Sequence, residues 1–294
     1  MTFSIVATNA DRSRFGVAVA SKFLAVGAAV PAARIGAGAL ATQAWANTAY
    51  KADGLALLTN GANAHETVAT LTKNDPKREQ RQLGVVDAHG TSATYTGGEC
   101  NDWAGGLSGE GYAIQGNILA GSRVVALMEE AWLGSDPAEP LARRLLAALA
   151  AGDAAGGDKR GRQSAALYVV SEEGGYGGGD DVLVDLRVDD HEAPIPELAR
   201  LLGIHDMIFG KPDPKDLLEL SGALAEEVRS LLGAQGYIAG GVTSAELDRV
   251  LAGWAGVENL EERLVPGRLD PIVLEHLRRL NTVGDVGKTG NLGV

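Results

Sequence analysis

The sequence predicts an α+β protein, with a four-layer αββα sandwich over residues 1–205 followed by a small all-α C-terminal domain. Three observations support this prediction. Strand-like segments lie at both ends of the first region, two pairs of helical segments lie between them, and the pattern becomes amphipathic and helical after Pro214. That order of elements matches a domain built of packed layers. We expect a linker at 206–214, a helical module at 215–280 and a flexible tail at 281–294.

The opening segments predict a β-hairpin. Residues 3–8 and 16–22 are rich in Val, Ile, Phe and Ala, and the polar run at 9–13 is typical of a turn. The second segment ends in Ser21 and Lys22. In an antiparallel hairpin this end lies beside the start of the first strand, so we expect Lys22 close to the N-terminus.

The remaining elements of the first region follow from periodicity and from Gly and Pro positions. A helix is expected over 52–73. Alternatively, a second helix starts at 63–66, because Asn63 and Glu66 have the spacing of a capping box. The other expected strands are 26–32 and 34–43 (split by Pro31), 80–88, 91–96, 112–118, 164–171 and 181–188, and the other expected helices are 121–133, 138–152 and 194–203.

The C-terminal region predicts three helices. Pro212 and Pro214 interrupt any helix that precedes them. Amphipathic helices are then expected over 215–233, 244–254 and 271–280, the last with Asp270 as its N-cap and Pro271 at its first position.

Composition excludes several classes of protein. The chain has 294 residues and a formal net charge of −12, without a basic stripe, so we expect no binding to nucleic acid or anionic membranes. The single cysteine, Cys100, is expected to be a packed side chain, and no Cys/His cluster has zinc spacing, so we expect neither metal nor cofactor. The sequence shows no signal-peptide pattern and no apolar run long enough for a membrane helix, which predicts a cytoplasmic location.

Thr2 is the first candidate catalytic residue. Removal of Met1 would leave one residue carrying both a hydroxyl nucleophile and an α-amine. An α-amine titrates at about pH 7.7–8.0, which suits a general base near neutrality. Lys22 would lower the pKa of this amine and steady an oxyanion. The alternatives are that Thr2 has no special role and that Lys22 is a solvated charge.

Much of the chain resembles a known bacterial family, the domain of unknown function 1028. The matching segments, which span almost all of residues 2–205, are 2–7, 16–23, 25–27, 41–44, 78–87, 112–117, 156–167 and 184–191. The family is placed among the N-terminal-nucleophile (Ntn) hydrolases, so the resemblance implies an Ntn-hydrolase-like αββα sandwich and hydrolysis of an amide bond. Residues 259–263 and 267–271 resemble a small peptidoglycan-binding-like helical module, which would alternatively form a dimer contact or a lid.

Polar residues at strand ends supply the other site candidates. Gln43 and Asn117 are expected oxyanion donors, because amides offer neutral N–H groups. By analogy with related Ntn enzymes, Ser164 would hold the α-amine. Arg81, Arg162 and Gln80 are expected to bind substrate, the arginines through a carboxylate. Each of these side chains has the alternative role of satisfying buried backbone or pairing with an acidic residue.

Together these expectations describe an Ntn-type amidohydrolase acting on a small amide or cyclic amide as a homo-oligomer, namely a dimer. The alternative is a catalytically silent scaffold whose C-terminal module binds a protein partner or a cell-wall fragment. The N-terminal mass separates the two, because the enzyme requires removal of Met1.

Overall fold

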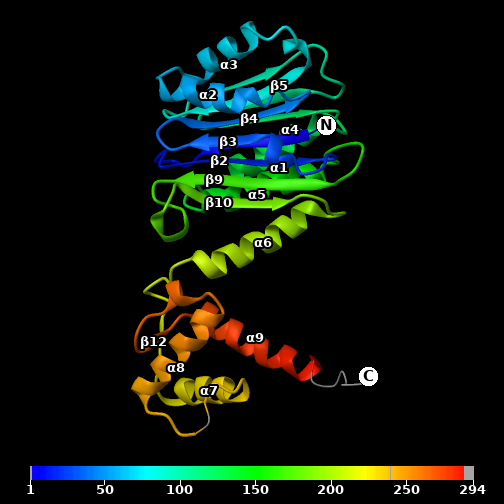
Figure 1. The fold of residues 1–294 in the computed structure, drawn as a ribbon. Helices are drawn as coiled ribbons and strands as arrows, with labels where there is room; N and C mark the ends of the chain where they lie inside the picture. The colour runs from blue at the N-terminus through cyan, green and yellow to red at the C-terminus, as the bar shows by residue number, and fades with distance from the viewer. Residues whose placement is uncertain (1, 239, 288–294) are drawn as a thin grey trace. The chain divides into compact units, whose positions relative to one another are not determined.

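The computed structural model describes residues 2–238 and 240–287. The chain divides into two compact units, residues 1–202 and 203–294. The first is a mixed α+β unit with two antiparallel sheets, and the second is mainly helical, as expected for the fold class (Figure 1).

A six-stranded sheet contains both the first and the last strand of the first unit, β1 (Thr2–Thr8) and β10 (Val182–Val188). Its central pair is the predicted hairpin, in which Phe3 lies opposite Ala20. The strands, in spatial order, are β10 (Val182–Val188), β9 (Ser164–Ser171), β2 (Arg14–Ser21), β1 (Thr2–Thr8), β8 (Tyr112–Asn117) and β7 (Gly105–Gly109). Strand β7 was not predicted, because three of its five residues are glycine and it lacks the β-branched pattern of its neighbours.

The second sheet has four strands. In spatial order they are β3 (Pro31–Arg34), β4 (Gly38–Ala44), β5 (Arg81–Asp87) and β6 (Ser92–Thr96). The strand expected over 26–32 is wrong in its first half, because Val26–Ala29 forms the short helix α1. Ala25 has a left-handed backbone (φ 51°) that turns the chain into α1, and Pro31 then begins β3 at the sheet edge, where its missing N–H is tolerated.

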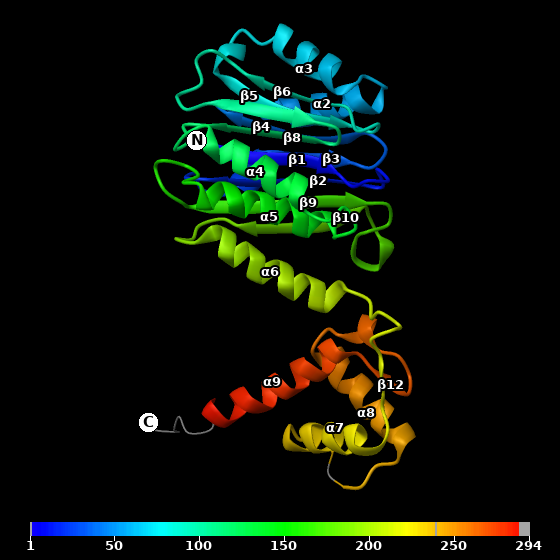
Figure 2. The same ribbon diagram turned by 180° about the vertical axis from the view of Figure 1, so that it is seen from behind.

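Helices flank the two sheets in pairs. Helices α2 (Ala49–Thr59) and α3 (Ala64–Lys73) pack on the four-stranded sheet, and α4 (Arg123–Gly134) and α5 (Leu141–Ala154) pack on the six-stranded sheet (Figure 2). The single helix over 52–73 is therefore wrong and the two-helix alternative is confirmed, with a complete capping box between Asn63 and Glu66. The 3-10 turn η1 (Arg78–Gln80) precedes β5.

Helix α6 (Pro194–Phe209) is longer than the expected helix over 194–203. Residues 204–209, part of which was expected to be linker, continue the helix because no proline occurs between Pro196 and Pro212. The helix ends at Phe209, directly before Gly210.

Strand β1 has two buried faces. Phe3, Ile5 and Ala7 pack into the cluster formed with α4 and α5, whereas Val6 packs between the two sheets. Because side chains alternate along a strand, Thr2 and Ser4 lie on the same face as Val6, toward the four-stranded sheet. This geometry directs the Thr2 side chain to the space between the sheets.

The second unit is built around the buried indole of Trp254. Its helices are α7 (Gly222–Ala234), α8 (Ser244–Val257) and α9 (Pro271–Gly287), with the 3-10 turn η3 (Glu261–Arg263) and a short ladder of β11 (Leu218–Glu219) and β12 (Arg268–Leu269). The ladder corrects the all-α expectation and moves the start of the first helix from 215 to Gly222. Helix α9 includes residues 281–287, which were expected to be tail, and the rest of that tail lies outside the described residues.

No helix within the described residues is both long and apolar enough to cross a membrane.

Candidate functional site

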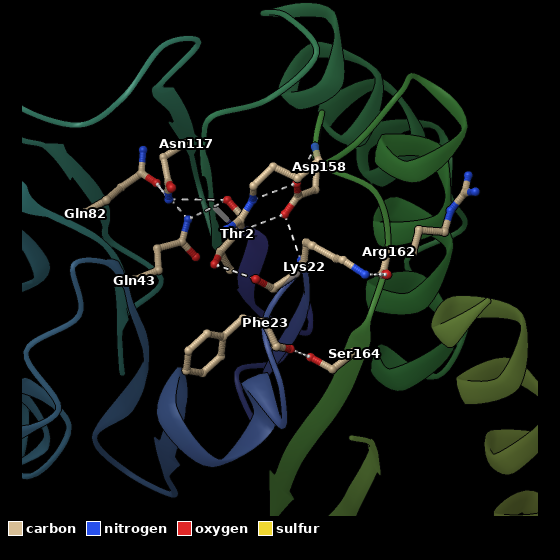
Figure 3. A network of polar contacts seen from close by, with 11 residues as sticks. Thr2, Lys22, Phe23, Gln43, Gln82, Asn117, Asp158, Arg162 and Ser164 are labelled. Atoms are coloured by element: carbon tan, nitrogen blue, oxygen red, sulfur yellow. Dashed lines mark hydrogen bonds and ion pairs between the residues drawn. The ribbon is translucent and has the colours of Figure 1, made fainter. Parts of the chain in front are cut away.

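Thr2 occupies the first position of β1 and is 6% exposed. Its Oγ1 lies 3.1 Å from the Oγ of Ser21, the last residue of β2 (Figure 3). The two hydroxyls face each other because the hairpin register that pairs Phe3 with Ala20 brings the strand ends together. Ser21, 2% exposed, was not among the predicted site residues, although its place at the end of β2 was a usable signal.

Two predicted amides hold the Thr2 carbonyl. Gln43 Nε2 donates to Thr2 O at 3.3 Å, and Asn117 Nδ2 approaches the same oxygen at 3.5 Å. Gln43 comes from β4 of the four-stranded sheet, whereas Asn117 pairs with Thr2 across β1 and β8. The start of β1 is therefore anchored to both sheets.

Gln82 on β5, which was not among the predicted site residues, links these two amides. Its Oε1 accepts from Gln43 Nε2 at 2.8 Å and from Asn117 Nδ2 at 2.9 Å. Its Nε2 donates to the carbonyl of Gly116 at 2.7 Å. Counting by two from the inward-facing Val86 reaches Gln82, so strand alternation was a signal for the face of β5 that Gln82 occupies, although not for its partners on other strands.

Ser4 and Gln115 extend the same network. Ser4 Oγ donates to Gln43 Oε1 at 2.7 Å and accepts from Gln115 Nε2 at 2.6 Å. These side chains are fully or almost fully buried. Buried amides are costly unless paired, so the network fixes the side-chain positions beneath Thr2.

Ser164 lies opposite Ser21 in the β2–β9 register. Its hydroxyl donates to the carbonyl of Phe23 at 2.5 Å and accepts from the backbone N–H of Val26 at 3.1 Å. These bonds hold the segment that follows β2, one residue beyond Lys22. Ser164 thus holds the loop beside Ser21.

Lys22 is exposed, and its side chain is directed to Arg162. Its Nζ donates to the carbonyl of Arg162 at 3.2 Å, and its backbone N–H donates to Asp158 Oδ2 at 2.8 Å (Figure 3). Asp158 is a buried carboxylate that was not among the predicted site residues, and it also accepts from the backbone N–H of Arg160. It fixes the end of β2 next to Ser21.

Arg162 is half-exposed and pairs with Asp153, with 2.7 Å between Nε and Oδ1. The hydrogen bond that Arg162 donates to Asp153 raises the pKa of Arg162, which keeps the guanidinium charged.

Arg81 and Gln80 are engaged elsewhere. Arg81 is buried, its Nε lies 2.8 Å from Asp75 Oδ2, and it also donates to the carbonyl of Trp45. The Arg81 hydrogen bond is the main reason that the pKa of Asp75 is held well below its usual range. Gln80 donates to Glu99 at 2.8 Å. Alternation places the Arg81 side chain on the opposite face of β5 from Gln82, so the structure does not bring it together with Thr2.

Among residues 2–238 and 240–287, no group of three or more His, Cys, Asp and Glu side chains is arranged to hold a metal ion.

Comparisons with known proteins match both units. Residues 2–198 match "Family of unknown function (DUF1028)", and residues 208–277 match "Putative peptidoglycan binding domain". A crystal structure of a Silicibacter pomeroyi protein of the DUF1028 family is 31% identical, with a TM-score of 0.62. The similarity covers 77% of this chain and 92% of that one. No curated protein matches the chain.

Proposed function

Because the chain belongs to DUF1028, a family of unknown function, we propose its activity from the geometry around Thr2. It is an Ntn-type amidohydrolase that cleaves the C–N bond of a small amide or cyclic amide. The observation that carries this proposal is the buried Thr2 hydroxyl at the first position of a central strand, 3.1 Å from Ser21 Oγ. Removal of Met1 would place an α-amine on the same residue as this hydroxyl.

The reaction uses Thr2 as both nucleophile and base. The α-amine takes the hydroxyl proton through a bridging water while Oγ1 forms a bond to the substrate carbonyl carbon. The C–N bond then breaks, and the proton passes to the leaving nitrogen. Water hydrolyses the resulting ester, which releases the acid and restores the Thr2 hydroxyl. With a cyclic amide the leaving amine remains attached to the product.

Asn117 is the better candidate for the oxyanion donor. Gln43 Nε2 already contacts three acceptors, Thr2 O, Gln82 Oε1 and the carbonyl of Gln115. Asn117 Nδ2 makes one short bond to Gln82 and one long contact of 3.5 Å to Thr2 O. An amide nitrogen has two hydrogens, so the Asn117 hydrogen that faces Thr2 O across the long contact would turn to donate to a developing negative charge. Gln43 would then position Thr2.

Lys22 and Ser164 would act on the amine indirectly. The Lys22 ammonium adds positive charge beside the end of β2, which disfavours a second charge on the Thr2 amine. Ser164 holds the segment carrying Phe23. Arg162, half-exposed and charged, is our candidate for binding a substrate carboxylate.

We assign the first unit to the four-layer αββα architecture of Ntn hydrolases. The support is that α2 and α3 pack on one sheet, α4 and α5 pack on the other, and Val6 belongs to the apolar cluster between the sheets.

The experiment has two parts. Intact mass of the purified protein is expected to show loss of Met1. A panel of small amides, cyclic imides and acylated amino acids is then tested with wild-type protein, Thr2→Ser and Thr2→Ala. We expect Thr2→Ser to keep part of the turnover, because it retains amine and hydroxyl, and Thr2→Ala to lose it. Wild-type turnover in Thr2→Ala on a confirmed substrate would refute the mechanism.

A silent Ntn-fold scaffold is the second candidate. It is favoured by the match of residues 208–277 to a peptidoglycan-binding model, which supports a binding role for the second unit. This candidate predicts that Met1 is retained and that no amide is turned over. It also predicts that the full-length chain binds soluble cell-wall fragments, whereas a truncated chain ending at residue 202 does not.

A further inference from the structure

Three large apolar side chains are exposed on the turns that follow the Thr2 site. Phe23 and Leu24, which follow Ser21 and Lys22, are 56% and 59% exposed. Trp45, two residues after Gln43, is 70% exposed. We call Phe23, Leu24 and Trp45 the apolar rim. An exposed indole, phenyl and isobutyl group at strand ends beside a site point to contact with another molecule.

The turn that carries Phe23 and Leu24 is held in place by its backbone. The carbonyl of Phe23 accepts from Ser164, and the N–H of Ala25 donates to the carbonyl of Asp189 at 3.0 Å. Ala25 adopts a left-handed conformation (φ 51°), which is unfavourable for a residue other than glycine. Figure 3 shows the Phe23 ring directed away from Ser164. A backbone this well fixed presents its apolar side chains at defined positions.

The turn that carries Trp45 is held in the same way. Its N–H donates to the carbonyl of Gln80 at 3.1 Å, and its own carbonyl accepts from Arg81, which is paired with Asp75. Ala44 before it is also left-handed (φ 66°). Two strained, well-anchored turns therefore present apolar groups to solvent, and each turn directly follows a strand that contributes a contact to Thr2.

Both turns start at residues that contact Thr2. Ser21 faces the Thr2 hydroxyl, and Gln43 holds the Thr2 carbonyl. Two residues of chain span at most about 7 Å, so the Cα atoms of Phe23 and Trp45 lie within that distance of the Cα atoms of Ser21 and Gln43. The rim residues therefore follow closely along the chain from the two residues that contact Thr2.

We infer that the apolar rim binds the acyl side of the substrate, and that this group is aromatic or a medium-length aliphatic chain. The inference rests on the proposed function, since it places the scissile carbonyl at Thr2. Contact between such a group and the rim removes apolar surface from water on both partners, worth at least about tenfold in affinity over an acetyl group. The rim thus sets substrate preference on the acyl side.

The test for turnover uses acyl p-nitroanilides with the full-length protein. Phenylacetyl and hexanoyl substrates are compared with acetyl for wild type, Phe23→Ala and Trp45→Ala. Leu133→Ala is the matched control, because Leu133 is 63% exposed on α4. We expect the rim variants to lose roughly tenfold in kcat/KM for the larger acyl groups and less than about twofold for acetyl. Equal losses for all three acyl groups would overturn the inference.

A binding measurement separates this inference from the proposed function. Thr2→Ala protein is titrated with phenylacetamide, hexanamide and acetamide by NMR, with and without Trp45→Ala. If the protein binds the larger amides more tightly and this preference requires Trp45, the inference about the apolar rim is supported. This holds even if no substrate is hydrolysed, and in that case the proposed function alone fails. Absence of preference overturns the inference. The alternative is that a second copy of the chain contacts the rim. Sedimentation of the same variants tests it: if they lose a dimer but keep the wild-type acyl preference, the rim is a contact between copies and the inference is overturned.

Discussion

The hydroxyl oxygens of Thr2 and Ser21 lie 3.1 Å apart across the ends of the first hairpin. This pairing restricts the rotamer of Thr2, because Ser21 is itself buried at the end of β2. The nucleophile is thus held by a neighbour from its own sheet, while its backbone carbonyl is held by Gln43 from the other sheet.

Replacement of Ser21 by Ala is expected to slow the reaction without unfolding the protein. One neutral hydrogen bond is worth about 0.5–1.5 kcal/mol, which corresponds to a loss of roughly two- to tenfold in kcat. Because Ser21 positions the nucleophile, we expect KM to change little. Steady-state kinetics on a confirmed substrate checks this prediction. The control is Ser108→Ala, an exposed position on β7, which should leave both constants unchanged.

Replacement of Lys22 by Met is expected to move the pH dependence of activity. If the Thr2 amine is the base, kcat/KM rises with pH as the amine loses its proton. A nearby ammonium lowers the pKa of that amine, so its removal should shift the rising limb to higher pH and lower the rate at neutral pH. The pH–rate profile is compared with that of Lys51→Met, whose amine contacts the carbonyl of Ala28 instead. An unchanged limb would mean that Lys22 does not tune the base.

The position of Thr2 could be predicted from the sequence because it depends on local rules. Two apolar segments around a polar turn define the hairpin, and alternation along β1 then determines which face Thr2 occupies. The capping box at Asn63 is similarly local, which is why the two-helix alternative could be stated at all.

The amide network could not be predicted, because it depends on packing between sheets. Gln82 meets Gln43 and Asn117 only when β4, β5 and β8 are brought together, and no spacing in the sequence encodes that approach. The same limit applies to Arg81. Its partner Asp75 lies on the loop before β5. The Arg81 guanidinium, which was expected to bind a substrate carboxylate, therefore holds that loop instead.

Replacement of Asp75 by Asn is expected to destabilise the first unit in a pH-dependent way. The pKa of Asp75 is lowered in the folded protein, chiefly by the hydrogen bond from Arg81. Its contribution to stability is therefore present above the unfolded pKa of about 3.9 and is lost as pH falls below it. At pH 7 the variant leaves Arg81 without its buried partner, at a cost of about 3 kcal/mol.

Urea unfolding at pH 7 and pH 3 measures this difference. We expect the difference in unfolding free energy between wild type and Asp75→Asn to narrow at pH 3, because the carboxyl is then largely protonated in the unfolded wild type while it stays ionised in the folded protein. Asp53→Asn, at an exposed position on α2, should have the same unfolding free energy as wild type at either pH. A gap that stays constant with pH would show that the Asp75 charge does not contribute to stability.

Replacement of Gly84 by Ala is expected to disrupt the amide network directly. A Cβ at position 84 would lie 2.0 Å from Gln115 Oε1, so the Gln115 amide would have to move. Its Nε2 donates to Ser4 at 2.6 Å within a buried cluster, and overpacking of such a site costs about 1–3 kcal/mol. Gly121→Ala is the control, because a Cβ there has no neighbour within 4 Å. Urea unfolding should separate the two variants by at least about 1 kcal/mol, and turnover should fall in Gly84→Ala alone, since only that change reaches the amides that hold Thr2.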